Sequence, residues 1–280
     1  MLEHSHVFEG KVAAVTGANR ANGIGAAVAI EFARQGAQTV YITGRTETPD
    51  LEQFIIPKIT ELGAEGRFIQ ADLVTREGVE NTIDTIRRGP QRLDVLVNNA
   101  GHLGNKPFFM LDWDTVDQTL GVDLKAPMML TALACNRRSP LFPKEGAVVV
   151  NIGSIVGVYG HMGQESYAAA KAGLAGFTKA AAQDLARIGV RMFTVNPGFA
   201  ATEMTSGIDE HARKVLTATI PTGDFLQPQD IANMVVDLCD SKRYAHLTGE
   251  VINLDGGVGG AFTALIPLRS AGLLAKPDPQ

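Results

Sequence analysis

Short apolar segments rich in β-branched residues alternate with longer amphipathic segments along most of the chain. This order is typical of a parallel sheet, because parallel strands need long crossover connections, and those connections are usually helices. Strands are predicted at residues 12–15, 39–43, 68–70, 95–98, 147–152, 191–195 and 251–254. Helices are predicted near residues 24–35, 51–62, 76–88, 114–137, 166–187 and 229–240. The pattern therefore predicts an α/β fold, with a doubly wound, seven-stranded parallel sheet covered by helices on both faces.

The composition fits one globular domain. The chain has 280 residues, of which 45% are hydrophobic and 20% charged, and a chain of this size can bury one large core. No repeat or low-complexity linker interrupts it. We therefore expect a single domain over residues 1–280, with its core at about 11–257 and a C-terminal extension at 258–280.

Charge and cysteine content argue against several functions. The net charge is −5 and no cluster of Lys and Arg occurs, which argues against a nucleic-acid partner. No apolar run approaches the roughly 20 residues of a membrane helix, so we expect a cytoplasmic protein without membrane contact. Cys135 and Cys239 lie far apart, and His, Cys and carboxylate residues show no ligand spacing, so no metal is expected.

A glycine-rich loop, TGANRANGIG, joins the first strand to the first helix. Glycines there let the backbone turn sharply and approach a pyrophosphate, while the helix amino terminus offers free N–H groups to the anion. An ordinary glycine turn into a helix is the alternative. The loop residues expected to bind a dinucleotide are Gly17, Asn19, Arg20, Gly23, Ile24 and Gly25.

The second strand ends in Thr43-Gly44-Arg45. A protein that binds NAD(H) normally places an acidic residue there to hold the ribose hydroxyls, and Gly44 leaves that role empty. Arg45, together with Arg20, could instead pair with a 2′-phosphate, because guanidinium and phosphate match in charge and geometry. This favours NADP(H) over NAD(H), unless Arg45 is an ordinary solvated surface charge.

Tyr167 and Lys171 are four positions apart in a predicted helix and therefore share one face. A nearby ammonium favours the phenolate form of a tyrosine, so the pair could act as an acid/base couple. Ser154 follows the strand at 147–152 and so lies where open α/β sheets bind ligands. Its hydroxyl could polarise a carbonyl while Tyr167 gives or takes the proton. Alternatively, Tyr167 and Lys171 belong to an ordinary amphipathic helix and Ser154 forms a turn.

Together these residues resemble the short-chain dehydrogenase/reductase family, and the match runs from about Lys11 to Gly257. Further segments resemble that family's motifs: Asp72-Leu73 at the adenine, Asn98-Asn99-Ala100-Gly101 on the fourth strand, Asn196-Pro197-Gly198 with Thr202 at the nicotinamide, and Leu254-Asp255-Gly256-Gly257 in the final strand.

The resemblance implies a Rossmann-type sheet and a catalytic Ser154, Tyr167 and Lys171. It also implies hydride transfer between NADP(H) and a small carbonyl compound or alcohol, with Lys171 holding the nicotinamide ribose. The helices near 114–137 and 166–187 would be the surfaces on which such proteins assemble as homodimers or homotetramers. Proteins of this fold that only bind dinucleotides, as sensors or scaffolds, commonly lose the Tyr and Lys, and this chain retains both.

The chain departs from the family pattern in three places. Five residues separate Gly17 from Gly23, as in divergent enoyl reductases, although those place six residues between the Tyr and the Lys, so enoyl reduction stays an alternative. The family usually has an Asn where this chain has Asp123. The Asp123 carboxylate could hold a water, stabilise the Lys171 ammonium, or accept backbone hydrogen bonds at a helix bend.

Bacterial reductases that act on carrier-protein thioesters have two arginines that bind the acidic carrier protein. The matching positions here are Met129 and Ile188, beside Arg187. This disfavours a carrier-bound 3-oxoacyl thioester as substrate without excluding it.

The substrate is not encoded in a motif. The segment 203–226 follows the nicotinamide loop and could close over an apolar substrate, or could simply pack on its own domain. Its apolar residues are Met204, Ile208, Leu216, Ile220 and Phe225. The tail at 261–274 extends beyond the usual end of the family, and we expect it to pack on a neighbouring subunit.

Overall fold

The computed structural model describes residues 7–136, 138–202, 205, 207 and 209–261. Their strands form one seven-stranded sheet in the order β3-β2-β1-β4-β5-β6-β7, and every neighbouring pair is parallel. The strands are β1 Val12–Val15, β2 Thr39–Gly44, β3 Glu65–Gln70, β4 Val95–Asn98, β5 Ala147–Ile152, β6 Val190–Pro197 and β7 Glu250–Leu254. This confirms the predicted α/β fold with a parallel sheet.

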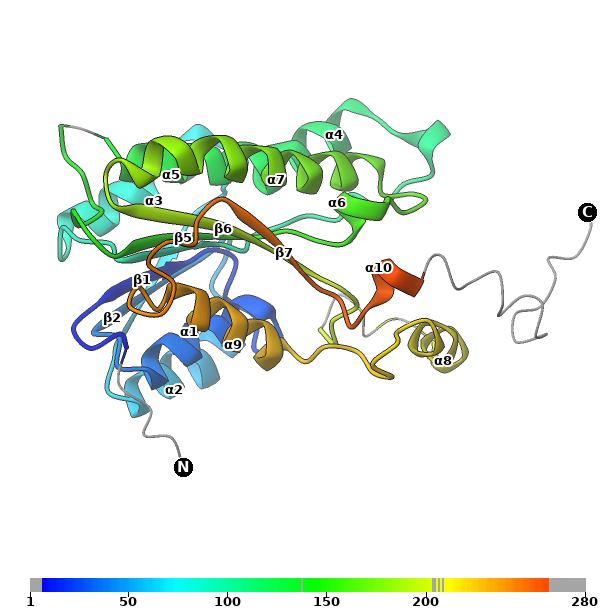
Figure 1. Ribbon diagram of the computed structural model, residues 1–280, viewed down its shortest axis with the longest axis horizontal. Helices are drawn as coiled ribbons and strands as arrows, with labels where there is room; N and C mark the ends of the chain where they lie inside the picture. The colour runs from blue at the N-terminus through cyan, green and yellow to red at the C-terminus, as the bar shows by residue number, and fades with distance from the viewer. Residues whose placement is uncertain (1–6, 137, 203–204, 206, 208, 262–280) are drawn as a thin grey trace, which may run out of the picture.

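Helices cover both faces of the sheet (Figure 1). Helices α1, α2 and α9 lie on one face, and α3, α4, α5 and α7 lie on the other (Figure 1). Their bounds are α1 Ile24–Arg34, α2 Ile56–Glu61, α3 Arg76–Arg88, α4 Trp113–Leu120, α5 Ala126–Ala134, α6 Val156–Tyr159, α7 Glu165–Ala186, α8 Glu210–Ala218, α9 Pro228–Cys239 and α10 Val258–Ala261. None of the described helices is long and apolar enough to cross a membrane.

The core lies on both sides of the central strands. Every residue of β1, β4, β5 and β6 is buried, as expected for strands covered by helices on both faces. Side chains alternate between the two layers: Ala13 and Val15 pack toward α1 and α9, whereas Val12 and Ala14 pack toward α3, α5 and α7. The sheet is therefore held between two apolar layers, and its carboxyl edge remains available for a site.

Strand β3 is longer than predicted, because it begins at Glu65 rather than at residue 68. It is an edge strand, and its first half carries polar side chains that reach solvent. Glu65 and Arg67 form an ion pair there, with 2.7 Å between Oε1 and Nε. An apolar run marks only the half of an edge strand that faces the core, so the prediction missed the other half.

The predicted helix at 114–137 is interrupted, which corrects the prediction. It consists of α4, a π turn η3 at Gly121–Lys125, and α5, which ends at Ala134; residue 137 lies outside the described part. Pro127 has no N–H group, so the carbonyl four residues earlier, that of Asp123, lacks its α-helical partner. The helix predicted at 51–62 is divided in the same way, by a π turn η1 at Leu51–Ile55 that precedes Pro57.

Candidate active site

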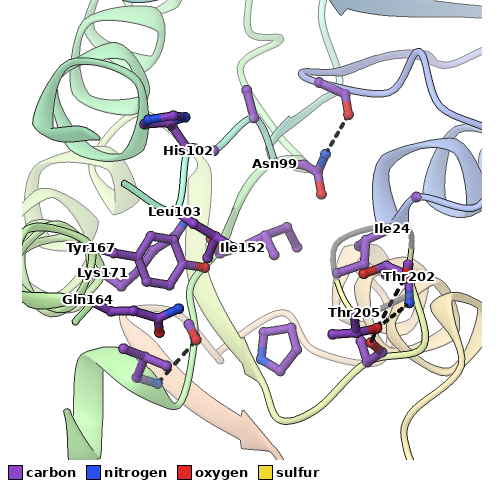
Figure 2. A pocket seen from close by; sticks show the side chains of 18 of the residues that line it. Ile24, Asn99, His102, Leu103, Ile152, Gln164, Tyr167, Lys171, Thr202 and Thr205 are labelled. Atoms are coloured by element: carbon purple, nitrogen blue, oxygen red, sulfur yellow. Dashed lines mark hydrogen bonds between the residues drawn. The ribbon is translucent and has the colours of Figure 1, made fainter. Parts of the chain in front are cut away.

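A cavity of about 1170 Å³ opens at the carboxyl ends of the strands. Most of the predicted site residues line it: Gly17, Asn19, Arg20, Gly23, Ile24, Arg45, Asp72, Leu73, Asn99, Ala100, Gly101, Ser154, Tyr167, Lys171, Pro197, Gly198 and Thr202. Figure 2 shows Tyr167 and Lys171 on one side of the cavity and Ile24 and Thr202 on the other. Residues from seven widely separated segments of the sequence thus surround one space.

The glycine loop is held against the fourth-strand motif. Gly17 has a φ of +64°, and a Cβ there would lie 2.7 Å from the Ala100 Cα. Asn99 donates from Nδ2 to the carbonyl oxygens of Thr16 and Gly17, at 2.8 and 3.0 Å. A Cβ on Gly25 would lie 2.5 Å from that same nitrogen. Gly25 therefore packs on Asn99 and is not among the residues that line the cavity, whereas Gly17 faces it.

The end of β2 cannot hold an acidic side chain. A Cβ on Gly44 would lie 2.6 Å from Cγ of Asn19. Asn19 is itself fixed, because its Nδ2 donates to the carbonyl oxygen of Thr46 at 2.9 Å. Arg20 and Arg45 line this end of the cavity. The residues present thus fit a phosphate beside the adenine ribose and leave no room for the carboxylate that would hold the ribose hydroxyls.

Ser154 is fixed by the backbone around it. Its N–H donates to Oδ1 of Asn196 at 3.1 Å, an approach that requires Gly153, because a Cβ there would lie 1.9 Å from that oxygen. The Ser154 hydroxyl oxygen accepts from the N–H of Val156 at 3.1 Å. Its remaining O–H can donate to a ligand in the cavity.

Tyr167 and Lys171 lie on the first turns of α7. Lys171 Nζ lies 5.4 Å from the centre of the Tyr167 ring and donates to the carbonyl oxygen of Ile152, at the end of β5, at 2.9 Å. The Lys171 side chain is only 4% exposed, while Tyr167 is half-buried. The two residues therefore form a couple at the carboxyl edge of the sheet, as their spacing predicts.

Asp123 lies behind this couple and is fully buried. Its Oδ1 is 2.9 Å from Lys171 Nζ, and its Oδ2 accepts the N–H of His102 at 2.8 Å. Burial alone would lower the pKa of Lys171, but attraction by Asp123 and Tyr167 and the hydrogen bond to Asp123 raise it above the ordinary value. Two of the roles considered for Asp123 are thus combined, because it accepts a backbone hydrogen bond at a helix bend and also stabilises the ammonium.

Several residues that line the cavity belong to none of the motifs found in the sequence. Leu103 and Gln164 line the wall beside Tyr167 (Figure 2). Gln164 Nε2 donates to Oδ1 of Asn105 at 2.8 Å, which ties the loop after β4 to the start of α7. His102 and His161 also line the cavity. From the sequence, only their position next to a motif could have suggested that these residues line the site. Their contacts join segments that are far apart in the chain.

The expected lid is only partly a cavity wall. Leu216 lines the cavity, whereas Ile220 and Phe225 are buried in a cluster with Ile155 and Val258. Met204 and Ile208 lie outside the described residues. Among the residues that the structure describes, no group of three or more His, Cys, Asp or Glu could hold a metal ion.

Comparisons with known proteins agree with this geometry. A family model described as enoyl-(acyl carrier protein) reductase matches residues 17–259. The 3-oxoacyl-[acyl-carrier-protein] reductase of Aquifex aeolicus is 35% identical over 255 residues, which is 90% of this chain and 98% of that protein. The corresponding reductase of Vibrio harveyi is 36% identical, with the same shares.

Solved structures show the same fold. A short-chain dehydrogenase from Burkholderia cenocepacia, in complex with NADP, has a TM-score of 0.81 and 31% identity over 90% of this chain and 99% of its own. A dehydrogenase/reductase from Sinorhizobium meliloti has a TM-score of 0.81 and 32% identity over 91% and 97%. With the motifs and the site, these matches show that the chain belongs to the short-chain dehydrogenase/reductase family of oxidoreductases.

Proposed function

We propose that the protein is an NADP(H)-dependent oxidoreductase that reduces a small ketone or aldehyde, or oxidises the corresponding secondary alcohol. One observation carries the proposal: Ser154, Tyr167 and Lys171 line the same cavity as the glycine loop. A dinucleotide on the loop and a carbonyl compound at the three side chains would therefore meet in one enclosed space.

Each side chain has a distinct role in this proposal. NADPH, when bound, supplies the hydride to the carbonyl carbon. Ser154 donates its O–H to the carbonyl oxygen and so holds and polarises it. Tyr167 donates the proton to that oxygen, and the resulting phenolate takes up a proton from solvent. Lys171 stabilises the phenolate by its charge and holds the nicotinamide ribose, while Asp123 and the carbonyl of Ile152 hold Lys171.

The preference for NADP(H) is assigned to Arg45 and Arg20 beside Gly44, where the Asn19 side chain occupies the place of an acidic side chain. The other residues proposed to hold the cofactor are Gly17, Asn19, Gly23 and Ile24 of the glycine loop, Asp72-Leu73, Asn99-Ala100-Gly101, and Pro197, Gly198 and Thr202. The test compares kcat/KM for NADPH and NADH. Replacing Arg45 by Ala should weaken NADPH use and leave NADH use nearly unchanged; a clear preference of the wild type for NADH would contradict the assignment.

Reduction of a 3-oxoacyl thioester is the second candidate, because reductases with that name are the curated relatives at about one-third identity. The positions aligned with the carrier-gripping arginines are the exposed apolar residues Met129 and Ile188, which favours a free thioester over a carrier-bound one. Enoyl reduction is supported by the description of the family model and by the spacing of Gly17 and Gly23. The three-residue gap between Tyr167 and Lys171 favours carbonyl chemistry instead.

The decisive experiment follows NADPH oxidation with a panel of ketones, quinones, and 3-oxoacyl and enoyl thioesters, with NADH in parallel. The proposal expects turnover of at least one carbonyl compound, and Tyr167→Phe should lower it by about 10²- to 10⁴-fold without loss of cofactor binding. Tight cofactor binding with no turnover of any compound would favour a sensor or scaffold. Turnover that survives Tyr167→Phe would refute the assigned acid.

We also propose a homodimer or homotetramer that assembles through α4, α5 and α7, a cytoplasmic location, and no nucleic-acid partner. Residues 1–280 would form one domain with its core at 11–257. Residues 262–280 of the extension lie outside the described part, so its packing on a neighbouring subunit stays a prediction. Light scattering of the full chain tests the proposed oligomeric state, and light scattering of a chain ending at Ala261 tests the role of the extension. Truncation should weaken assembly, and an unchanged oligomer mass would refute the role of the extension.

A further inference from the structure

The buried carboxylate of Asp123 meets two donors that approach from different segments. One is the backbone N–H of His102, in the loop after β4, and the other is the Lys171 ammonium on α7. The carboxylate accepts the His102 hydrogen bond on one oxygen and forms an ion pair with Lys171 through the other, whereas an Asn side chain has one acceptor oxygen and no charge. The local geometry therefore calls for Asp rather than the Asn usual in the family.

The backbone closes around this pair. A Cβ on Gly101 would lie 2.7 Å from Oδ1 of Asp123 and 3.6 Å from Lys171 Nζ, so only a glycine lets the chain pass there. Asp123 is fully buried and Lys171 is 4% exposed, which leaves little water to screen either charge. The carboxylate thus acts on its neighbours more strongly than a surface charge would.

Lys171 also faces Tyr167, with Nζ 5.4 Å from the ring centre. A positive charge at that distance stabilises a phenolate, and a carboxylate in contact with the ammonium cancels part of that effect. The ammonium remains positioned, since Asp123 and Ile152 both hold it. The Asp123–Lys171 pair therefore holds the ammonium in place beside Tyr167, with a smaller net positive charge than Lys171 alone would have.

We propose that Asp123 is a positioning residue that partly neutralises Lys171 and so keeps Tyr167 protonated to higher pH, which biases the site toward carbonyl reduction near neutral pH. This inference rests on the proposed role of Tyr167 as the proton donor. With an uncharged residue at position 123, the phenolate would form at lower pH. Alcohol oxidation, which needs the phenolate as base, would then reach its full rate at lower pH.

The test is the pH profile of Asp123→Asn in both directions. The rising limb of alcohol oxidation and the falling limb of carbonyl reduction should both move to lower pH by about one unit. On the rising limb, that shift corresponds to roughly a tenfold faster oxidation at a given pH. Asp123→Ser, which is smaller and also neutral, should shift both limbs in the same direction and serves if Asp123→Asn does not fold.

A second readout does not depend on turnover. Ultraviolet difference titration of the protein without cofactor follows tyrosinate formation, and subtraction of the Tyr167→Phe titration isolates the signal of Tyr167. That signal should move to lower pH in Asp123→Asn. His102, His161 and Tyr159 also line the cavity, and the subtraction removes their contribution.

The matched control is Asp94→Asn, which removes another buried carboxylate, paired with Arg92 at the opposite end of β4. It should lower stability and leave both pH limbs in place. An Asp123→Asn protein that folds, turns over and keeps the wild-type limbs and tyrosinate titration would overturn the inference, even though Tyr167→Phe remained inactive. A Tyr167→Phe protein that keeps its turnover would instead overturn the proposed function.

Discussion

Two buried carboxylates flank the fourth strand, one at each end. Each is paired with a cationic side chain, and the two cations differ in their exposure to solvent. At the amino end, Asp94 accepts from the N–H of Val12 at 2.9 Å and pairs with Arg92, with Oδ1 2.6 Å from Nη2. At the carboxyl end, Asp123 accepts from His102 and pairs with Lys171. The Arg92 side chain is 52% exposed, whereas that of Lys171 is 4% exposed.

The difference shows how one kind of contact serves two purposes. Arg92 reaches solvent and pairs with Asp94 within one segment, while the hydrogen bond from the Val12 N–H to Asp94 fastens the start of β4 to β1. Lys171 is enclosed beside the cavity, so its charge can act on groups that bind there. Burial of the cation, rather than the presence of an ion pair, therefore distinguishes the end of the sheet at the cavity from the opposite end.

The largest effect should come from Lys171→Met. It removes the cation from the proposed catalytic couple and leaves Asp123 buried without its charge partner, so turnover should fall by about 10²- to 10⁴-fold and stability by about 3–5 kcal/mol. Steady-state kinetics and denaturant unfolding measure the two losses. The double variant Lys171→Met/Asp123→Asn should recover part of the stability and none of the turnover; a single variant as stable as the wild type would contradict the comparison.

Gly101→Ala should act selectively at the cavity end of the sheet. The new Cβ would lie 2.7 Å from Oδ1 of Asp123, so the carboxylate and Lys171 must shift, and we expect a loss of turnover on the order of 10- to 100-fold. Stopped-flow or steady-state assays with saturating NADPH measure it. Unchanged kcat would show that the pair tolerates displacement.

Asp94→Asn should affect stability alone. The amide can keep only part of the contacts to Arg92 and Val12, so we expect a loss of about 1–3 kcal/mol in unfolding free energy. Urea titration measures this loss, and kcat should stay within about twofold of wild type. A larger loss of kcat would mean that the two ends of β4 are coupled.

Alkaline pH should weaken the fold through Lys171. Its pKa in the folded protein is raised above the ordinary value of 10.5, so its contribution is fully present below that pH and is lost as pH rises through the folded pKa. Unfolding free energy measured across this range should fall more steeply for the wild type than for Lys171→Met. Parallel curves for the two proteins would rule out this contribution.

The smallest effect should be a gain. A Cβ on Gly176, in the middle of α7, would meet nothing within 4 Å, so Gly176→Ala should stabilise the helix by about 0.5–1 kcal/mol and leave kcat unchanged. Thermal unfolding measures it. The contrast with Gly101→Ala separates the cost of a side chain at a crowded glycine from the benefit at an open one.

The sequence was enough to predict the parallel sheet and to bring the glycine loop, Tyr167 and Lys171 together at one end of it, because each depends on local spacing. Periodicity locates buried strands and helices, and four-residue spacing puts Tyr167 and Lys171 on one face of α7. The start of β3 and the short helices α6 and α10 were missed, since short or half-exposed elements carry little apolar periodicity. Helix α8 was missed because the segment 203–226 was interpreted only as a possible lid. The contact of Gly25 with Asn99 was also beyond reach, because it joins segments far apart in the chain.

The pairing of Asp123 with Lys171 was only one of several possibilities at the level of sequence. Choosing among them required the position of His102, whose N–H supplies the second donor. It also required the π turn, which the uninterrupted apolar pattern of 114–137 concealed. Long-range partners and irregular helix geometry thus account for what the pattern left open.

The π turn η3 also sets the helical phase of everything that follows it. Buried residues recur every four positions across it, at Thr115, Thr119, Asp123, Pro127 and Thr131. A uniform α-helix would rotate such a series by about 160° between its first and last members, because four residues exceed one turn. The wider turn takes back part of that rotation. Because a π turn takes in one residue more than the same stretch of α-helix, removing one residue from 121–125 would leave the apolar side of α5 facing the sheet, whereas removing one residue within α5 would rotate the residues that follow it by about 100°.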